Sequence, residues 1–418
     1  MDLESIYKYY TENYLIDTDT RNIRQNSMFF ALKGENFNGN MFAEKALSFG
    51  ASYAVIDEAE YKTDDRIILV DDALHTLQRL ANYHRKKLSI PIFGLTGSNG
   101  KTTTKELINA VLSKKYRTTA TQGNLNNHIG VPLTLLSMTP ETEIGIVEMG
   151  ANHQKEIAFL SSICEPDYGY ITNFGKAHLE GFGGVEGVIK GKSELYTFLR
   201  AHKKTAFINP HDSIQVEKTK DIKKVVFLES ITYLGLNPYV KLSYKNDTIQ
   251  SNLIGKYNYY NIAIACTVGH FFKVNYLDIK KAIENYIPDN NRSQVIQKGS
   301  NTIILDAYNA NPSSMIAALE NFNAMTFKSK TVILGDMFEL ASDSEKEHQF
   351  ITKLAGKFSF DCCLFVGKHF SKVSTNPNFF KNFDDLYDSL KNNPLQHQSI
   401  LIKGSRGMRL ERLLEIIN

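Results

Sequence analysis

The stretch GLTGSNGKTTTKE, residues 94–106, has the residue types of a loop that binds nucleotide phosphates. Its backbone can turn tightly and point amide groups inward because three positions are glycine: Gly94, Gly97 and Gly100. Lys101 would neutralise the β- and γ-phosphates, and the hydroxyl of Thr102 would bind Mg²⁺. The spacing departs from G-x-x-x-x-G-K-[ST], because position 95 is Leu and the first glycine lies one residue earlier. The alternative, a glycine-rich surface turn, is disfavoured by the apolar strand before the loop and the helix after it.

Further groups suited to phosphate chemistry follow the next apolar runs. Glu148 ends one run and could hold Mg²⁺, and His178 lies just beyond the run at 168–174. Lys190 and Lys192 lie near the start of a predicted helix. Alone, such a histidine is more often structural and such lysines are usually solvated. Only their occurrence together with the phosphate loop and Glu148 favours a functional role.

The loop variant TGSNGKTTT, residues 96–104, resembles the phosphate loop of the Mur ligases of bacterial cell-wall synthesis and of their relative folylpolyglutamate synthase. These enzymes join a carboxylate to an amine at the expense of ATP. The resemblance implies that ATP contacts the loop residues Gly97, Ser98, Asn99, Gly100, Lys101, Thr102 and Thr103.

The same resemblance implies two Mg²⁺ ions and a modified lysine. One ion would be held by Thr102 and Glu148, and the other by His178 and Lys192. In the family, the lysine that precedes a stretch like Ser-Glu-Leu-Tyr here carries a carbamate made from CO₂. This position matches Lys192, with Lys190 as the lesser candidate. A carbamate supplies the anionic oxygen that Mg²⁺ prefers and that an ammonium lacks. The expected catalytic residues are therefore Lys101, Glu148, His178 and Lys192.

The stretch GNLNNHIGVPLTLL, residues 123–136, resembles the family segment whose asparagines contact the acceptor substrate. The resemblance implies this role for Asn126 and Asn127. The alternative is an asparagine-rich turn, which asparagine favours in any protein.

The stretch LDAYNANPSSM, residues 305–315, resembles the D-x-Y-N-A-N-P segment of the branch that adds D-alanyl-D-alanine. The Asp-Asn-Pro-Arg segment of the diaminopimelate-adding branch is absent. ILGDMFELA at 333–341 and LIKGSRGMRLE at 401–411 also resemble the first branch. The substrate contacts expected in this region are Tyr308, Asn309, Asn311, Lys403 and Arg406. For the last two, the alternative is a basic turn after a strand.

One stretch departs from the family pattern. Relatives have Gly-x-His-Asn-x-x-Asn, whereas residues 255–261 read GKYNYYN, with Tyr257 in place of the histidine. Asn258 and Asn261 are retained, and we expect them to contact the nucleotide while Tyr257 stacks on the adenine. Arg292 and Asp306 are expected to approach the same nucleotide.

The helices and strands expected around these residues indicate a three-domain α/β fold. Residues 1–88 form a small N-terminal domain that resembles the UDP-binding module of the tripeptide-processing members, which implies that Thr20 and Arg21 contact the nucleotide end of the precursor. The alternative for this pair is an ordinary polar loop. The expected elements of this domain are strands at 27–32 and 51–57 and helices at 42–50 and 72–88.

Residues 89–288 are predicted to form a P-loop ATPase-like central domain with a mostly parallel sheet. Weaker strand signals at 224–254 suggest an antiparallel edge, and a helix at 258–272 closes the domain. Residues 289–418 alternate strand and helix, which predicts a Rossmann-like C-terminal domain. Its strands are expected at 302–307, 330–336, 362–367 and 399–404. Ligands gather at carboxyl ends of such strands, where the sequence places Asp306, Asp336 and Lys403. A polar stretch at 288–292 is the predicted hinge.

Composition limits the classes of partner. The 418 residues carry 48 basic and 45 acidic side chains, a net charge of +3, so no strong global field favours nucleic acid or a membrane surface. Four cysteines without a Cys-x-x-Cys pair suggest reduced thiols. There is no signal-peptide pattern and no apolar stretch of about 20 residues. We therefore expect a cytoplasmic protein. We also expect a monomer.

The resemblance implies that the protein joins D-Ala-D-Ala to UDP-MurNAc-tripeptide through an acyl phosphate, which gives the pentapeptide precursor of peptidoglycan. One alternative is the same chemistry with another amino-acid donor. The other is a nucleotide-binding regulator that has lost turnover. Some ninety residues precede the phosphate loop, which argues against folylpolyglutamate synthase.

Overall fold

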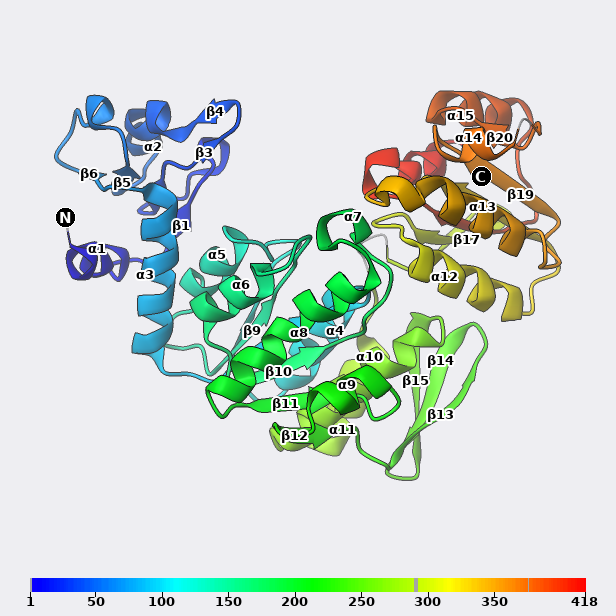
Figure 1. Ribbon diagram of the computed structural model, residues 1–418, viewed down its shortest axis with the longest axis horizontal. Coiled ribbons are helices and arrows are strands. Elements are labelled where there is room, and N and C mark those ends of the chain that lie inside the picture. Colours follow the sequence, from blue (N-terminus) through cyan, green and yellow to red (C-terminus); the bar gives the residue numbers. More distant parts are fainter. Residues whose placement is uncertain (1, 289–291, 375) are drawn as a thin grey trace.

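The computed structural model describes residues 2–288, 292–374 and 376–418. Figure 1 shows three α/β parts in chain order, with the helix α3 (Ala73–Leu88) joining the first to the second. Three separate, mainly parallel sheets confirm the predicted three-domain α/β fold. The predicted domain boundaries stay predictions. The predicted hinge at 288–292 lies mostly outside the described residues.

The N-terminal part is a four-stranded parallel sheet in the order β1-β2-β5-β6. Its central strands are buried and apolar because α2 covers one face and α3 the other. The elements are α1 (Leu3–Tyr10), β1 (Ile16–Asp17), η1 (Thr20–Asn22), β2 (Met28–Phe30), β3 (Lys33–Gly34), β4 (Phe37–Asn38), η2 (Gly39–Phe42), α2 (Ala43–Ser48), β5 (Tyr53–Ile56), η3 (Ala59–Tyr61) and β6 (Ile67–Leu69).

The central part is a six-stranded parallel sheet in the order β12-β11-β10-β7-β9-β8. One face carries α5, α6 and α8, and the other carries α4, α10 and α11. The elements are β7 (Ile92–Thr96), α4 (Lys101–Leu112), β8 (Thr118–Ala120), α5 (Gly130–Leu136), β9 (Ile144–Glu148), α6 (Glu156–Cys164), β10 (Tyr168–Ile171), α7 (Leu179–Phe182), α8 (Val185–Ala201), β11 (Thr205–Ile208), α9 (Ser213–Lys218), β12 (Lys223–Val226), α10 (Tyr257–Phe271) and α11 (Tyr276–Asn285).

Antiparallel strands are present at 231–254 as expected, but the interpretation of 224–254 as an edge of the central sheet is wrong. β12 pairs with β11 in parallel, at the edge of the central sheet. The strands β13 (Ile231–Leu236), β14 (Tyr239–Tyr244) and β15 (Asp247–Ile254) form a separate antiparallel sheet. Its buried residues, such as Val240, Leu242 and Ile249, pack against the layer of α10 and α11. Each strand can thus bury one face without joining the main sheet.

The C-terminal part is a six-stranded sheet in the order β16-β17-β21-β18-β19-β20, parallel except for the edge strand β16. Because β17 and β21 are neighbours in register, Asp306 lies directly beside Lys403. The elements are β16 (Gln294–Lys298), β17 (Asn301–Asp306), α12 (Pro312–Ala324), β18 (Lys330–Gly335), η4 (Ala341–Asp343), α13 (Ser344–Ala355), β19 (Cys362–Val366), α14 (Phe370–Val373), β20 (Phe379–Phe380), α15 (Phe383–Asn392), β21 (Ser399–Lys403), η5 (Arg406–Met408) and η6 (Leu410–Glu415).

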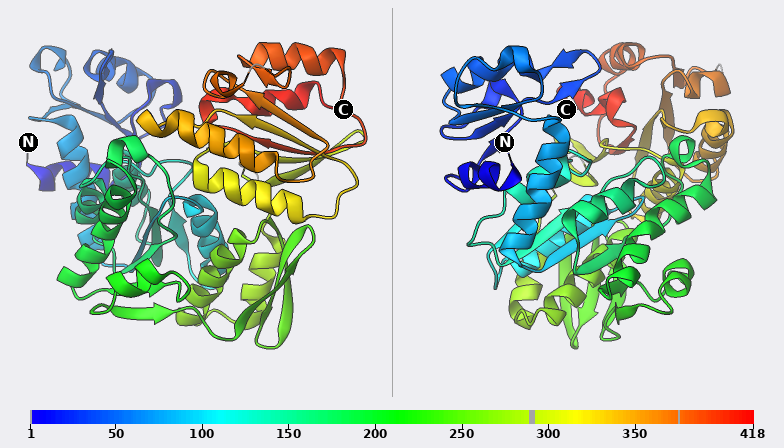
Figure 2. Two further views of the ribbon diagram at one scale, coloured as in Figure 1. Left: turned by 45° about the vertical axis from the view of Figure 1, so that its right-hand side comes forward. Right: turned by 60° about the vertical axis from the view of Figure 1, so that its left-hand side comes forward.

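In Figures 1 and 2 the two terminal parts lie on the same side of the central part, above it in these views. The segment after β17, in the C-terminal part, lies close to the carboxyl ends of β7, β9 and β10 in the central part. Within the described ranges, no helix has the length and apolar character needed to cross a membrane.

Candidate active site

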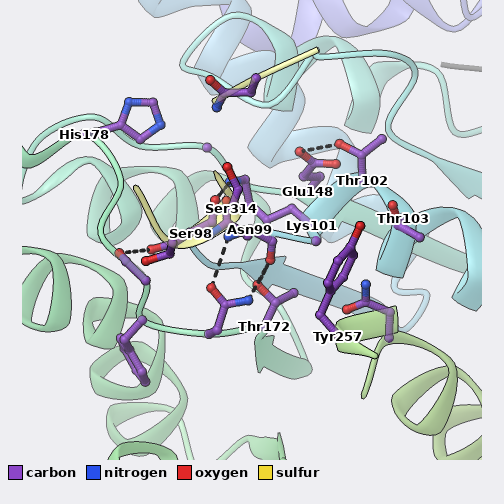
Figure 3. Close-up of a pocket in the computed structure, with 18 of the residues that line it drawn as sticks. Ser98, Asn99, Lys101, Thr102, Thr103, Glu148, Thr172, His178, Tyr257 and Ser314 are labelled. Carbon is purple, nitrogen blue, oxygen red and sulfur yellow. Dashed lines mark hydrogen bonds between the residues drawn. The ribbon is translucent and has the colours of Figure 1, made fainter. Parts of the chain in front are cut away.

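A cavity of about 990 Å³ lies where the central and C-terminal parts meet (Figure 3). It gathers most of the residues predicted from the sequence, although they come from eight separate stretches of chain. Those that line it are Ser98, Asn99, Gly100, Lys101, Thr102, Thr103, Asn126, Asn127, Glu148, His178, Tyr257, Asn258, Asn261, Arg292, Asp306, Tyr308, Asn309 and Lys403.

The phosphate loop needs glycine for both conformation and space. Gly97 has φ +144°, and a Cβ there would lie 2.0 Å from Oγ1 of Thr172. Gly100 has φ +78° and faces the side chain of Asn261. The loop is also tied to the next strand, since Thr172 donates to the carbonyl of Asn99 at 2.6 Å and the Ser98 amide donates to the carbonyl of residue 173 at 3.1 Å. Its shape is therefore set by protein contacts.

Lys101 begins α4 and folds back over the loop, where its Nζ donates to the carbonyl of Gly97 at 2.7 Å and to that of Ser98 at 3.3 Å. Burial lowers the pKa of Lys101, and the nearby carboxylate of Glu148 opposes that shift. An anion in the cavity would favour the charged amine, so the site is suited to phosphate.

Glu148 ends β9 with its side chain buried. Its Oε1 accepts hydrogen bonds from Asn126 at 2.8 Å and from Thr102 at 3.3 Å. Its Oε2 is buried without a hydrogen-bond partner among the described residues. An unsatisfied carboxylate oxygen next to a threonine hydroxyl fits Mg²⁺, which prefers oxygen ligands. No group of three or more His, Cys, Asp or Glu side chains placed for one metal occurs in residues 2–288, 292–374 and 376–418, so phosphate or water would complete the coordination.

His178 lines the cavity and adopts a left-handed backbone conformation, with φ +52°. Its Nδ1 forms a hydrogen bond with Oε2 of Glu339, which comes from the C-terminal part. This bond is the main reason that the pKa of Glu339 is lowered.

Lys192 is 1% exposed, and its Nζ donates to the carbonyl of Ala151 at 3.0 Å. Burial, followed by repulsion from Lys101, holds the pKa of Lys192 well below its usual range. The neutral amine is the form that can add CO₂. Lys190 is exposed and lines a different hollow, so its position is unlike that of Lys192.

The two asparagines of α10 brace the phosphate loop. Asn258 donates to the carbonyl of Ile254 at 2.7 Å, and Asn261 donates to Asn258 at 2.8 Å and accepts from Thr104 at 3.1 Å. The hydroxyl of Tyr257 is bound to that of Ser293 at 2.5 Å, which links α10 to the C-terminal part. The predicted contacts of these residues with adenine stay predictions.

The C-terminal part brings a charged cluster to the cavity. Lys403 donates to Asp306 at 2.6 Å and to the carbonyl of Asn309 at 3.1 Å. The guanidinium of Arg292 lies 3.7 Å from the ring centre of Tyr308, and that of Arg406 lies 5.1 Å from it. Such stacking fixes the direction of both cations without neutralising them.

Several predicted residues lie elsewhere. Thr20 and Arg21 are on η1 of the N-terminal part, outside this cavity, and Arg21 pairs with Asp19. Asp336 follows β18 but is buried, and its carboxylate accepts the amides of His369 and Phe370 at 2.9 Å, so it braces a turn of the fold. Gly97, Lys192, Asn311 and Arg406 lie near the cavity without lining it.

Contacts between the parts involve Asn311, which the sequence predicted as a substrate contact, and other residues that the sequence did not single out. Asn311 donates to the side chain of Asn99 at 2.8 Å, so it meets the phosphate loop itself. Lys176 donates its amide to Ser313 at 2.8 Å and its Nζ to Glu347 at 2.8 Å. Glu339 lies in the stretch ILGDMFELA, and the resemblance of that stretch to the family was the one signal in the sequence that pointed to it.

Comparison with known proteins gives the chain its relatives. It matches the Mur ligase middle domain over residues 95–269, the Mur ligase glutamate ligase domain over 291–406 and the Mur ligase family catalytic domain over 12–85. It is 33% identical to UDP-N-acetylmuramoyl-tripeptide–D-alanyl-D-alanine ligase of Bacillus subtilis, across 96% of this chain and 92% of that one. Among solved structures, MurF of Acinetobacter baumannii has a TM-score of 0.85 and 30% identity, covering 96% of this chain and 92% of the other. MurF of Thermotoga maritima in complex with ADP has a TM-score of 0.83 and 26% identity, covering 96% of both chains.

Proposed function

The chain belongs to the Mur ligase family, and from this premise we propose that it is the ATP-dependent ligase that joins D-Ala-D-Ala to UDP-MurNAc-tripeptide. The product is the pentapeptide precursor of peptidoglycan. The observation that carries the proposal is the cavity, which combines a phosphate loop, an unsatisfied carboxylate oxygen and a cationic cluster from a second domain. Relatives named for this reaction match the chain over nearly its whole length.

The chemistry requires an activated carboxylate. A carboxylate is a poor electrophile, and transfer of the γ-phosphoryl group of ATP converts it into an acyl phosphate with a good leaving group. The amine of D-Ala-D-Ala then forms the amide, and phosphate departs. The carboxylate and the γ-phosphate are both anions, so their approach must be offset by positive charge.

Lys101 is placed to supply that charge at the phosphates once it leaves the loop carbonyls. Thr102 and Glu148 offer the oxygen donors for Mg²⁺, and His178 with a carbamylated Lys192 would hold a second ion. Bound there, Mg²⁺ would act as a Lewis acid toward the phosphoryl oxygens.

The carbamate is supported by the environment of Lys192. Its amine is buried and its pKa lies well below the ordinary range, so it can attack CO₂ and lose a proton to give the carbamate. We expect protein equilibrated with ¹³C-bicarbonate to give one carbamate signal in ¹³C spectra. The Lys192→Gln variant should lose that signal, whereas Lys190→Gln should keep it. The opposite pattern would move the modification to Lys190.

Closure of the C-terminal part would exclude water from the acyl phosphate. Asn311, Ser313 and Glu347 already contact the loop and its neighbours in the central part. Arg292 and Arg406, held on Tyr308, are available to the nucleotide and to the incoming dipeptide. The N-terminal part, with Thr20 and Arg21, would hold the UDP end of the precursor.

The test is phosphate release from ATP with UDP-MurNAc-tripeptide and each of five amines: D-Ala-D-Ala, D-Ala, meso-diaminopimelate, L-Lys and L-Glu. Turnover only with D-Ala-D-Ala is expected. Turnover with another amine would keep the ligase chemistry and replace the donor. Silence with every donor, under ample bicarbonate and Mg²⁺, would instead favour a nucleotide-binding regulator. Sedimentation of the same sample tests the expected monomer.

A further inference from the structure

The segment that carries His178 is shaped by the C-terminal part. It leaves β10 and runs to α7, and three side chains from the other part hold it: Ser313, Glu339 and Glu347. The amide of residue 180 adds a longer contact, donating to the carbonyl of Glu339 at 3.5 Å. Docking of the C-terminal part therefore determines where His178 lies.

The backbone angles of His178 and Glu339 fit this dependence on docking. His178 has φ +52° and Glu339 has φ +61°, and both are non-glycine residues in the left-handed region. Such conformations cost about 1–3 kcal/mol each and persist only where neighbouring contacts enforce them. Here the two residues are each other's hydrogen-bond partners across the interface.

The bond between them fixes the proton on the imidazole ring. A carboxylate can only accept, so Nδ1 of His178 carries the hydrogen that is donated to Oε2 of Glu339. The other nitrogen, Nε2, forms no hydrogen bond with the described residues, and the side chain lines the same cavity as Lys101 and Glu148. The lone pair of Nε2 is thus left for a ligand of the cavity.

We propose that Glu339 is a positioning residue that, on docking of the C-terminal part, holds His178 in its Nδ1–H form and leaves Nε2 as the acceptor or ligand at the cavity. The proposal rests on the proposed function, because it gives His178 a task in phosphoryl transfer. A carboxylate behind a ligating histidine is a common way to orient the ring and fix its tautomer. What is particular here is that the carboxylate belongs to a different domain, so the histidine is organised only when the two domains meet.

The kinetic test uses four variants of the full chain. His178→Ala measures whether the histidine matters at all. Glu339→Ala removes the acceptor, whereas Glu339→Gln keeps a carbonyl oxygen that can accept from Nδ1. Glu345→Ala is the control, since Glu345 is an exposed carboxylate of α13 whose one side-chain bond with the described residues is to Gln349. Loss of such a partner typically lowers activity by about 10–100-fold.

We expect kcat to fall by about tenfold or more in Glu339→Ala and to stay near wild type in Glu339→Gln and Glu345→Ala. The KM for ATP should change little, because the phosphate loop keeps its own contacts. If His178→Ala keeps full turnover, the role of the histidine in the proposed function is wrong. If His178→Ala is impaired but Glu339→Ala is not, the proposed function stands and the positioning role is wrong.

A readout without turnover separates positioning from general stability. In ¹⁵N-histidine spectra of the protein with ADP and Mg²⁺, the ring of His178, assigned by its loss in His178→Ala, should show the Nδ1–H form at a pH where the ring is neutral. In Glu339→Ala that preference should disappear, and in Glu339→Gln it should return. An unchanged tautomer in Glu339→Ala would overturn the proposal even if activity fell.

Discussion

Replacing Gly97 by alanine tests whether the shape of the phosphate loop is set by protein contacts. Two effects oppose a side chain there. The backbone angle, φ +144°, is one that L residues rarely adopt, and the new Cβ would lie 2.0 Å from Oγ1 of Thr172 and 2.9 Å from its amide nitrogen. Since Thr172 also binds the carbonyl of Asn99, it cannot move away without disturbing the loop.

The magnitude follows from these two effects. Backbone strain of this kind costs about 1–3 kcal/mol, and forcing atoms into a packed site costs about 1–3 kcal/mol. The loop would relax part of this by changing shape, so we expect the affinity for ADP to fall by at least about tenfold, or about 1.4 kcal/mol. Gly235→Ala is a matched control, because Gly235 has φ +154° but, apart from its chain neighbours, no atom of the described residues lies within 4 Å of the added Cβ.

The assay is calorimetric titration with ADP and Mg²⁺, with thermal unfolding of each variant alongside. Gly235→Ala should lose some thermal stability and keep its ADP affinity. Gly97→Ala should lose affinity, because the clash with Thr172 displaces the loop. Equal ADP affinities for Gly97→Ala and wild type would refute the idea that the contacts with Thr172 determine the binding loop.

Three further predictions address the interfaces. Burial lowers the pKa of His84, so below pH 6.5 the unfolded chain binds a proton more readily than the folded protein, and stability is lost as the pH falls. The His84→Gln variant should therefore have a thermal midpoint that is less sensitive to pH in this range. An identical pH profile for the variant and the wild type would contradict this. Tyr257→Phe keeps the ring but loses the bond to Ser293, so it should lower kcat and leave the KM for ATP unchanged. Tyr257→Ala should raise that KM if the ring stacks on adenine. An unaltered KM in Tyr257→Ala would exclude stacking. Asn311→Ala removes both the bond to Asn99 and the N-cap of α12. The free energy of unfolding should therefore fall by about 1 kcal/mol, and X-ray scattering should show a less compact protein. Unchanged scattering would mean that this contact does not hold the domains together.

Local patterns predicted the parts of the site that depend on local geometry. The phosphate loop could be recognised because glycine, lysine and threonine at fixed spacing determine where amides and a hydroxyl point. The proximity of Asp306 and Lys403 followed from their places at the ends of parallel strands. Lys192 and Lys190 lie two positions apart on one helix, so they face different sides, and burial separates them.

Contacts between distant segments could not be predicted in this way. His178 and Glu339 are 161 residues apart, and no local pattern says that two domains will bring them together. The strands at 231–254 show the same limit, because alternation of side chains indicates a strand but not its partner. Asp336 lies at the carboxyl end of a strand, where ligands usually bind, yet its carboxylate accepts hydrogen bonds from two backbone amides of the fold instead.

The two interfaces of the central part differ in kind, and this difference identifies the part that moves. Toward the N-terminal part, the largely buried Arg85 forms an ion pair with the partly exposed Asp167 at 2.7 Å. His84 binds the carbonyl of residue 138 at 2.8 Å, and Tyr10 binds that of residue 136 at 2.9 Å. These bonds lie beside the packing of α3 against α5 and α6, so parting the two would expose apolar surface and unpaired polar groups. Toward the C-terminal part, several polar contacts near the cavity involve exposed or half-exposed side chains, such as Lys176 and Glu339. Such contacts exchange readily with water. The central and N-terminal parts should therefore move as one body, and the C-terminal part is the one free to open for substrates and to close over them.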